Sequence, residues 1–283
     1  MYAAQFKKVT KNYLSFSIDN LDLKIPAGCI TGLVGKNGAG KSTLIKLLLS
    51  IISPDSGTIE ILGDEVTSTP LHNEEIGVVL DSSSFSGYLN AKQIDNIMDS
   101  IYKTWDSTRF FKYLECFQID VTKKVKDYSK GMTMKLQIAV ALSHDTKLLI
   151  LDEATSGLDP VIREQILDIL LDFIQSEEHS VLISSHILSD LEKVCDYIAF
   201  LHDGKLLFME EKDMLMEEYG ILKCTKEQLL LLDKRDILGT RNNAFMAEAL
   251  IKKSLQDSLP FKAVVDSANI EEIMIFLESG VNL

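Results

Sequence analysis

The sequence predicts an α/β fold built on a mainly parallel sheet. Short apolar runs indicate buried strands at residues 29–34, 76–80 and 147–153, and a fourth follows at residues 180–185. Such runs, apolar without a clean alternation, are typical of strands that are covered on both faces. Helical patterns separate the runs, which is the order of elements that a parallel sheet requires.

Residues from about 89 to 145 have a different pattern and predict a helical subdomain inserted between two strands. Apolar side chains recur there every three or four positions, at Ile94, Ile97, Met98 and Ile101 and again at Phe110, Phe111, Leu114 and Phe117. This spacing places them on one face of a helix, as in amphipathic helices that cover a core.

The two ends of the chain complete the predicted architecture. Residues 4–9 and 16–25 alternate between apolar and polar side chains, which predicts an antiparallel β subdomain. The last part shows helical patterns at residues 226–232 and 269–277 and a strand-like run at residues 261–265. We therefore expect a main domain at 1–220 and a small α+β appendage at 221–283, with a regulatory or dimerising role left open.

Charge and composition exclude several classes of function. The formal net charge of −13 argues against binding to nucleic acid or to anionic membranes, since both favour a basic face. No apolar run approaches the roughly 20 residues that cross a bilayer, so any membrane contact is expected to run through another chain. The four cysteines are widely spaced, which predicts free thiols in a reducing compartment.

The run GKNGAGKST at residues 35–43 fits the pattern G-x-x-x-x-G-K-[ST] of a phosphate-binding loop. It follows a predicted strand and precedes an apolar helix, so backbone N–H groups and the helix dipole converge on one point. Lys41 is expected to reach the β- and γ-phosphates, and the Ser42 hydroxyl to take one position on Mg²⁺. The candidate nucleotide-binding residues of this loop are Gly35, Asn37, Gly38, Gly40, Lys41, Ser42 and Thr43.

Two later strands end in residues suited to phosphoryl chemistry. Asp152 and Glu153 end one of them, and His186 ends the next. Because parallel strands direct their carboxyl ends toward the ligand crevice, Asp152 is expected to hold the hydration shell of Mg²⁺. Glu153 is expected to orient or deprotonate the attacking water, and His186 to donate a hydrogen bond to the γ-phosphate.

Other candidates have a structural alternative. Tyr13 is placed to stack on an adenine ring, or to cover the sheet edge as a turn residue. Ser129 and Gly131 precede a helix expected from about Thr133, which gives either a second anion-binding site or an ordinary helix cap. Asp159 lies immediately before a proline that suits the first turn of a further helix.

Taken together, residues 1–215 resemble the nucleotide-binding subunit of an ATP-binding-cassette (ABC) transporter. The motifs occur in the family's order: the phosphate loop at 35–43, the signature at 128–132, the strand with its carboxylates at 148–153, the D-loop at 156–159 and the switch histidine, His186. The resemblance implies a P-loop ATPase core that uses ATP and Mg²⁺. It also implies that two cassettes pack head to tail, expected here as a homodimer, with each ATP between the loop of one chain and Ser129 and Gly131 of the other.

Two motifs depart from the family pattern. The signature, usually LSGGQ, has Lys130 and Met132 in place of the first glycine and the glutamine, and Asp81 stands where a glutamine usually follows the strand at 76–80. Asp81 is a candidate metal ligand whose charge adds repulsion near the phosphates.

The resemblance further implies the exporter branch with a separate transmembrane permease, which serves antimicrobial peptides, bacitracin-type drugs and peptide toxins. The chain is then expected in the cytoplasm, on the inner face of the membrane.

Two other classes of function remain open at this point. A soluble ABC ATPase that acts on ribosomes or DNA usually has two cassettes in one chain, or a long coiled-coil insertion, and a basic surface, and this sequence indicates none of them. A degenerate cassette that only binds ATP and regulates is the second alternative. The presence of Lys41, Asp152, Glu153 and His186 argues against it.

Overall fold

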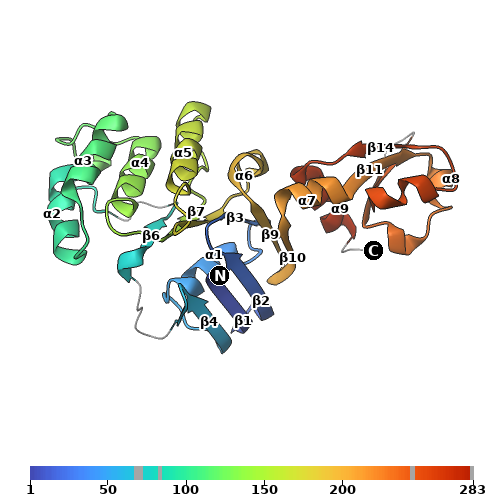
Figure 1. Ribbon diagram of the computed structural model, residues 1–283, viewed down its shortest axis with the longest axis horizontal. Helices are drawn as coiled ribbons and strands as arrows, with labels where there is room; N and C mark the ends of the chain where they lie inside the picture. The colour runs from blue at the N-terminus through green and yellow to red at the C-terminus, as the bar shows by residue number, and fades with distance from the viewer. Residues whose placement is uncertain (67–72, 82–84, 243–245, 281–283) are drawn as a thin grey trace. The chain divides into compact units, whose positions relative to one another are not determined.

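The computed structural model describes residues 1–66, 73–81, 85–242 and 246–280 (Figure 1). The chain divides into two compact units, Met1–Met209 and Glu210–Leu283. This division precedes the boundary expected near Gly220, because helix α7 (Lys212–Glu218) packs on strand and helix elements of the second unit.

A six-stranded sheet forms the centre of the first unit, with the strand order β10-β9-β3-β8-β7-β6. The strands are β3 (Ile30–Val34), β6 (Ile76–Val79), β7 (Leu148–Asp152), β8 (Ser180–Ser184), β9 (Tyr197–His202) and β10 (Lys205–Glu211). The pairs β6–β7, β7–β8, β8–β3 and β3–β9 are parallel. The mainly parallel sheet predicted from the apolar runs is confirmed.

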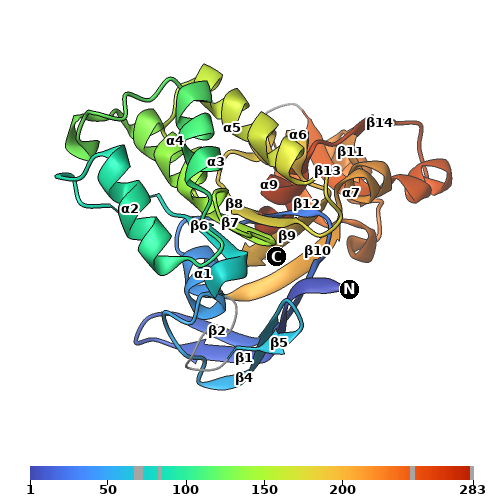
Figure 2. The same cartoon turned by 60° about the vertical axis from the view of Figure 1, so that its left-hand side comes forward.

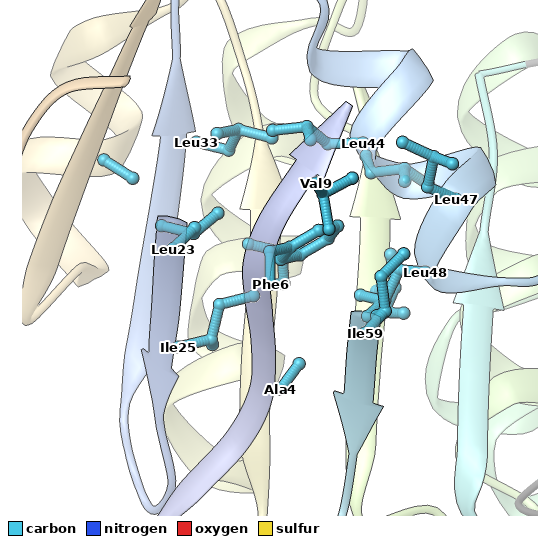
Figure 3. Close-up of a cluster of buried hydrophobic side chains, with 14 of the residues drawn as sticks. Ala4, Phe6, Val9, Leu23, Ile25, Leu33, Leu44, Leu47, Leu48 and Ile59 are labelled. Atoms are coloured by element: carbon cyan, nitrogen blue, oxygen red, sulfur yellow. The ribbon is translucent and has the colours of Figure 1, made fainter. Parts of the chain in front are cut away.

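A second, antiparallel sheet has the order β2-β1-β4-β5. Its strands are β1 (Tyr2–Asn12), β2 (Ser17–Pro26), β4 (Ser56–Ile61) and β5 (Asp64–Glu65). Side chains of this sheet, such as Phe6 and Ile25, form one buried cluster with Leu44 and Leu48 of helix α1 (Lys41–Leu48) and with Leu33 of the parallel sheet (Figure 3). Helix α1 therefore packs between the two sheets, and this packing fixes the position of the loop at the N-terminus of the helix.

The remaining helices of the first unit are α2 (Ala91–Ile101), α3 (Ser107–Cys116), α4 (Lys130–Ala141), α5 (Pro160–Phe173) and α6 (Leu188–Val194), with short 3₁₀ turns at Asn73–Glu75 and Val125–Asp127. Helix α1 lies on one face of the parallel sheet, and α5 and α6 lie on the other (Figure 2). Helices α2 to α4 share a separate core around Ile94, Phe110 and Leu136. The inserted helical part is thus a subdomain with its own packing.

The second unit is a four-stranded antiparallel sheet with helices, in the order β12-β13-β11-β14. Its elements are α7, β11 (Tyr219–Cys224), α8 (Lys226–Leu229), β12 (Gly239–Asn242), β13 (Ala247–Lys252), β14 (Val264–Ser267) and α9 (Ile270–Gly280), with 3₁₀ turns at Lys234–Asp236 and Lys253–Ser258. The helix predicted at 226–232 ends at Leu229, and both Leu229 and Leu232 pack against the buried cluster of the sheet. Across the described residues, no helix combines the length and apolar character needed to cross a bilayer.

Candidate nucleotide-binding site

A pocket of about 500 Å³ lies where the strands of the parallel sheet end. Residues that follow β3, β6, β7 and β8 contribute to its wall, as expected for a ligand crevice at the carboxyl edge of such a sheet. Its lining consists of Phe16, Lys36, Asn37, Gly38, Gly40, Lys41, Ser42, Thr43, Asp81, Glu153, Ser156 and His186.

The loop between β3 and α1 has a backbone that requires glycine. Gly40, the N-cap of α1, has φ +111°, and a Cβ there would lie 2.8 Å from the ring of Phe16. A Cβ at Gly35 would lie 2.3 Å from the carbonyl oxygen of Leu201. At Gly38, φ is +87° and a Cβ would meet nothing within 4 Å, so this part of the loop is open. The backbone can therefore approach a phosphate closely, as a polyphosphate cradle requires.

Lys41 is the first residue of α1, and its side chain is only 6% exposed. Its ammonium donates to the carbonyl oxygens of Gly35 at 2.6 Å and of Lys36 at 3.3 Å. It also lies 3.6 Å from Oε1 of Glu153. A buried cation is thus held against the loop on the side where the Glu153 carboxylate lies.

Glu153 and His186 meet in this pocket although they come from different strands. Nδ1 of His186 lies 2.5 Å from Oε2 of Glu153, and the two oxygens of this carboxylate therefore have different partners. The backbone of Glu153 has φ +53°, a value that residues other than glycine rarely adopt. Its N–H donates to both the carbonyl and the hydroxyl oxygen of Ser184, each at 3.1 Å, and these bonds hold the unusual conformation.

Asp152 lies beside this group but does not line the pocket. The hydroxyl of Ser184, which is fully buried, donates to Oδ1 of Asp152 at 2.6 Å. Strand register explains the contact, because Asp152 pairs with Ser184 across β7 and β8. One serine therefore orients both consecutive acidic residues.

Asp81 lines the pocket and pairs with a residue of the helical subdomain. Its Oδ1 lies 2.9 Å from Nζ of Lys130, the first residue of α4. Both side chains are about half exposed. Two of the three residues that depart from the family pattern, Asp81 and Lys130, are thus in direct contact with each other.

Besides Asp152 and Gly35, four expected site residues do not line the pocket. Tyr13 is half exposed, with its ring centroid 6.4 Å from that of Phe16. The hydroxyl of Ser129 caps α4 by accepting from the N–H of Met132 at 3.2 Å, and Asp159 caps α5 by accepting from Ile162 at 3.1 Å. Gly131 is buried, and a Cβ there would lie 2.5 Å from Cδ1 of Ile162.

Several pocket residues were not identified from the sequence. Phe16 lines it, as do Lys36 and Ser156, which lie in the phosphate loop and the D-loop but were not singled out as site residues. Ser184 is hydrogen-bonded to Asp152 and Glu153. The position of Ser184 at a strand end, beside the strand that carries the carboxylates, is the one signal that pointed to it. Phe16 belongs to no sequence motif. Its position depends on a turn in which the N–H of Tyr13 donates to the carbonyl oxygen of Phe16 at 2.8 Å.

Comparison with known proteins places this site in a family. A family model described as "ABC transporter" matches residues 18–156. The lantibiotic transport ATP-binding protein SrtF of Streptococcus pyogenes is 35% identical over 197 residues, which are 69% of this chain and 85% of that protein. The bacitracin transport ATP-binding protein BcrA of Bacillus licheniformis is 36% identical over 203 residues, 70% of this chain and 66% of that protein.

A solved structure supports the fold. The dimeric structure of a post-hydrolysis state of the ATP-binding cassette MJ0796, bound to ADP and Pi, has a TM-score of 0.65 at 21% identity, and the match covers 74% of this chain and 98% of that one. The matching relatives, the order of the motifs and the geometry of the pocket agree. This chain is a member of the ABC transporter ATP-binding protein family.

Proposed function

We propose that this chain hydrolyses ATP and that hydrolysis powers the export of a peptide or other hydrophobic substrate through a separate permease. The observation that carries the proposal is the position of Glu153. One oxygen of its carboxylate faces the Lys41 ammonium at 3.6 Å and the other faces His186 at 2.5 Å, inside a pocket lined by the glycine loop. A carboxylate held in this way is suited to orient and deprotonate a water molecule.

Binding of the triphosphate is assigned to the loop and the first turn of α1. The N–H groups of the loop and of the helix N-terminus have few partners within the helix, so they are available to phosphate oxygens. Lys41 supplies the compensating positive charge. Tyr13 is proposed to stack on the adenine ring, next to Phe16 at the pocket wall.

The hydrolytic step uses the two residues that meet in the pocket. Glu153 accepts a proton from water as the water oxygen bonds to the γ-phosphorus and the bond to the β–γ bridging oxygen breaks. His186 positions the carboxylate and donates a hydrogen bond toward the γ-phosphate. The products are ADP and inorganic phosphate, and Lys41 stabilises the charge that develops between them.

The chemistry of the donor set fits Mg²⁺, which favours oxygen ligands and commonly completes its shell with substrate phosphates and water. Ser42 lines the pocket, and the Asp152 carboxylate, which precedes the pocket residue Glu153 in the chain, accepts from the Ser184 hydroxyl. Among the described residues, no cluster of three or more His, Cys, Asp or Glu could hold a metal by itself. Bound there, Mg²⁺ supplies charge neutralisation to the phosphates.

A second copy of the chain is proposed to complete the site. Ser129 and Asp159 are exposed and lie outside the pocket of their own chain. In a head-to-tail homodimer, Ser129, Gly131 and Asp159 would face the nucleotide of the other copy. The dimeric form of the similar cassette MJ0796 supports this arrangement.

The permease is proposed to dock on an apolar groove of about 540 Å³ in the first unit. Its lining includes Ile51 and Ile101, each 59% exposed, and three acidic residues, Asp64, Glu65 and Glu74. An amphipathic helix with basic residues complements such a surface. Leu80 lines this groove and the next residue, Asp81, lines the nucleotide pocket, so a permease seated here would act directly on the nucleotide site.

The relatives guide the proposal on substrate and location. SrtF and BcrA are described as lantibiotic and bacitracin transport proteins, which favours a peptide antibiotic as the exported substrate here. The chain would then lie in the cytoplasm, held at the membrane by its permease.

Phosphate release by the purified chain tests this function. With ATP and Mg²⁺, we expect a specific activity that rises with protein concentration as the dimer forms, and further stimulation by the permease in proteoliposomes. Nucleotide binding without turnover, with or without the permease, would instead support a regulatory cassette.

A further inference from the structure

The ammonium of Lys130 links three segments around the nucleotide pocket. It lies 2.9 Å from Oδ1 of Asp81, which follows β6. A Cβ built on Gly157, in the loop after β7, would lie 3.4 Å from the same Nζ. The first residue of α4 therefore reaches from the helical subdomain to two loops at the carboxyl edge of the sheet.

The pocket contains two acidic side chains, Asp81 and Glu153. Glu153 has Lys41 and His186 as partners. The partner that the structure gives to Asp81 is Lys130. Because a triphosphate brings several negative charges into this space, an uncompensated carboxylate at its wall would weaken nucleotide binding.

We propose that Lys130 is a positioning residue that neutralises Asp81 and so sets the affinity of the pocket for ATP. Asp81 then acts as the partner of Lys130 and not as a ligand of the metal. This inference rests on the proposed function, because it assigns a role within the ATP pocket. It explains two of the three unusual positions together, because the lysine in the signature compensates the acid that follows β6.

The two roles of Asp81 predict opposite effects of one substitution. If Lys130 neutralises Asp81, Lys130→Met leaves a free carboxylate at the pocket wall and ATP binds more weakly. If Asp81 is a metal ligand, the same change frees it for Mg²⁺ and ATP binds more tightly when Mg²⁺ is present. The substitution is mild for the fold, because Lys130 is exposed, methionine favours helices, and a cation at a helix N-terminus opposes the helix dipole.

A double-mutant cycle separates the pair from direct effects on the nucleotide. Binding of a fluorescent ATP analogue is measured for wild type, Lys130→Met, Asp81→Asn and the double variant, with Mg²⁺ and with EDTA. Lys92→Met, on α2 and outside the pocket, is the control with the same change of net charge. We expect Lys130→Met to weaken binding about three- to fivefold, a size typical of a half-exposed ion pair, and to have almost no effect when Asp81 is already asparagine.

Two results would overturn the inference. An equal loss in both backgrounds would mean that Lys130 acts without Asp81. Tighter binding by Lys130→Met in Mg²⁺ alone would make Asp81 a metal ligand. Failure of the wild type to bind the analogue would instead refute the proposed function, so the two failures are distinguishable.

A second measurement is independent of affinity. A carbodiimide joins a carboxylate to an amine in direct contact, and mass spectrometry of the digested protein identifies the joined peptides. We expect a link between Asp81 and Lys130 that persists when Mg²⁺ and ATP are added and that Asp81→Asn removes. Loss of the link on addition of Mg²⁺ and ATP would contradict the proposal, because Asp81 would then have left Lys130.

Discussion

Replacement of Ser184 by alanine tests whether one buried hydroxyl positions the carboxylates of Asp152 and Glu153. The hydroxyl donates to Asp152 at 2.6 Å and accepts from the N–H of Glu153 at 3.1 Å. Glu153 keeps its bond to the carbonyl oxygen of residue 184 after the change. The main loss is therefore the hydrogen bond to the ionised Asp152, and such bonds contribute about 1.5–3 kcal/mol.

A loss of about 2 kcal/mol corresponds to a roughly 30-fold weaker affinity, since each 1.4 kcal/mol is a factor of ten in a binding constant. If Asp152 helps to hold Mg²⁺, Ser184→Ala should raise the Mg²⁺ concentration needed for half-maximal ATP hydrolysis by about 10- to 100-fold. The assay is phosphate release against Mg²⁺ concentration at saturating ATP.

Ser180→Ala provides a matched control on the same strand. Ser180 is also buried, at the other end of β8, and its hydroxyl accepts from the N–H of Gly28 at 3.0 Å. It should lower the thermal stability of the protein but leave the Mg²⁺ dependence unchanged. If both variants have the same Mg²⁺ dependence as the wild type, Ser184 does not position a metal-holding carboxylate and the reasoning is refuted.

Three further predictions address the adenine contact, the pH dependence of stability and the permease groove. Tyr13→Ala should weaken ATP binding by about 1–3 kcal/mol, the usual loss of one base–aromatic stack, and leave inorganic tripolyphosphate binding unchanged; equal losses for both ligands, measured by calorimetry, would contradict stacking. Burial is the main cause that holds the pKa of His144 below its usual value. The contribution of His144 to folding stability should therefore be complete above pH ~6.5 and decrease as the pH falls below it, because the unfolded chain then binds the proton more readily. His144→Phe should reduce this slope in denaturant titrations followed by the fluorescence of Trp105, the single tryptophan, and an unchanged slope would refute the assignment. Ile101→Glu should leave ATP hydrolysis by the isolated chain unchanged and abolish stimulation by the permease in proteoliposomes, whereas full stimulation would exclude the groove as the docking site.

The phosphate loop could be predicted from the sequence because its chemistry is contained in consecutive residues. Residues 35–43 specify the strand end, the glycine turns and the helix start together. Asp152, Glu153 and His186 were predictable for a related reason, since each ends an apolar run and parallel strands end at one edge. The structure brings Lys41, Glu153 and His186 into contact.

Contacts between distant parts of the chain could not be predicted. Asp81 and Lys130 are 49 positions apart, and no local pattern relates them. Ser184 lies 32 positions from Asp152, and its role follows from the register of two strands. The start of α4 was also misplaced. The helix was expected from about Thr133 but begins at Lys130, because the hydroxyl of Ser129 accepts a hydrogen bond from the N–H of Met132 and so caps the helix.

The sheet of the second unit was largely missed for another reason. Strands such as β11 and β13 are short, and β13 mixes alanine and leucine with charged residues that favour helices. Their β conformation depends on pairing with each other over six positions and on packing against residues from later turns. Such non-local contacts override local propensity.

The measurement that tests the central claim most directly compares ATP binding and phosphate release in wild type and Glu153→Gln. Glutamine keeps the shape of the side chain and a carbonyl oxygen, but it cannot accept the proton of the attacking water. The account predicts that Glu153→Gln binds ATP as tightly as the wild type, releases no phosphate above background and accumulates as an ATP-bound dimer in size-exclusion chromatography. Phosphate release at the wild-type rate would show that Glu153 is not the base and would contradict the account.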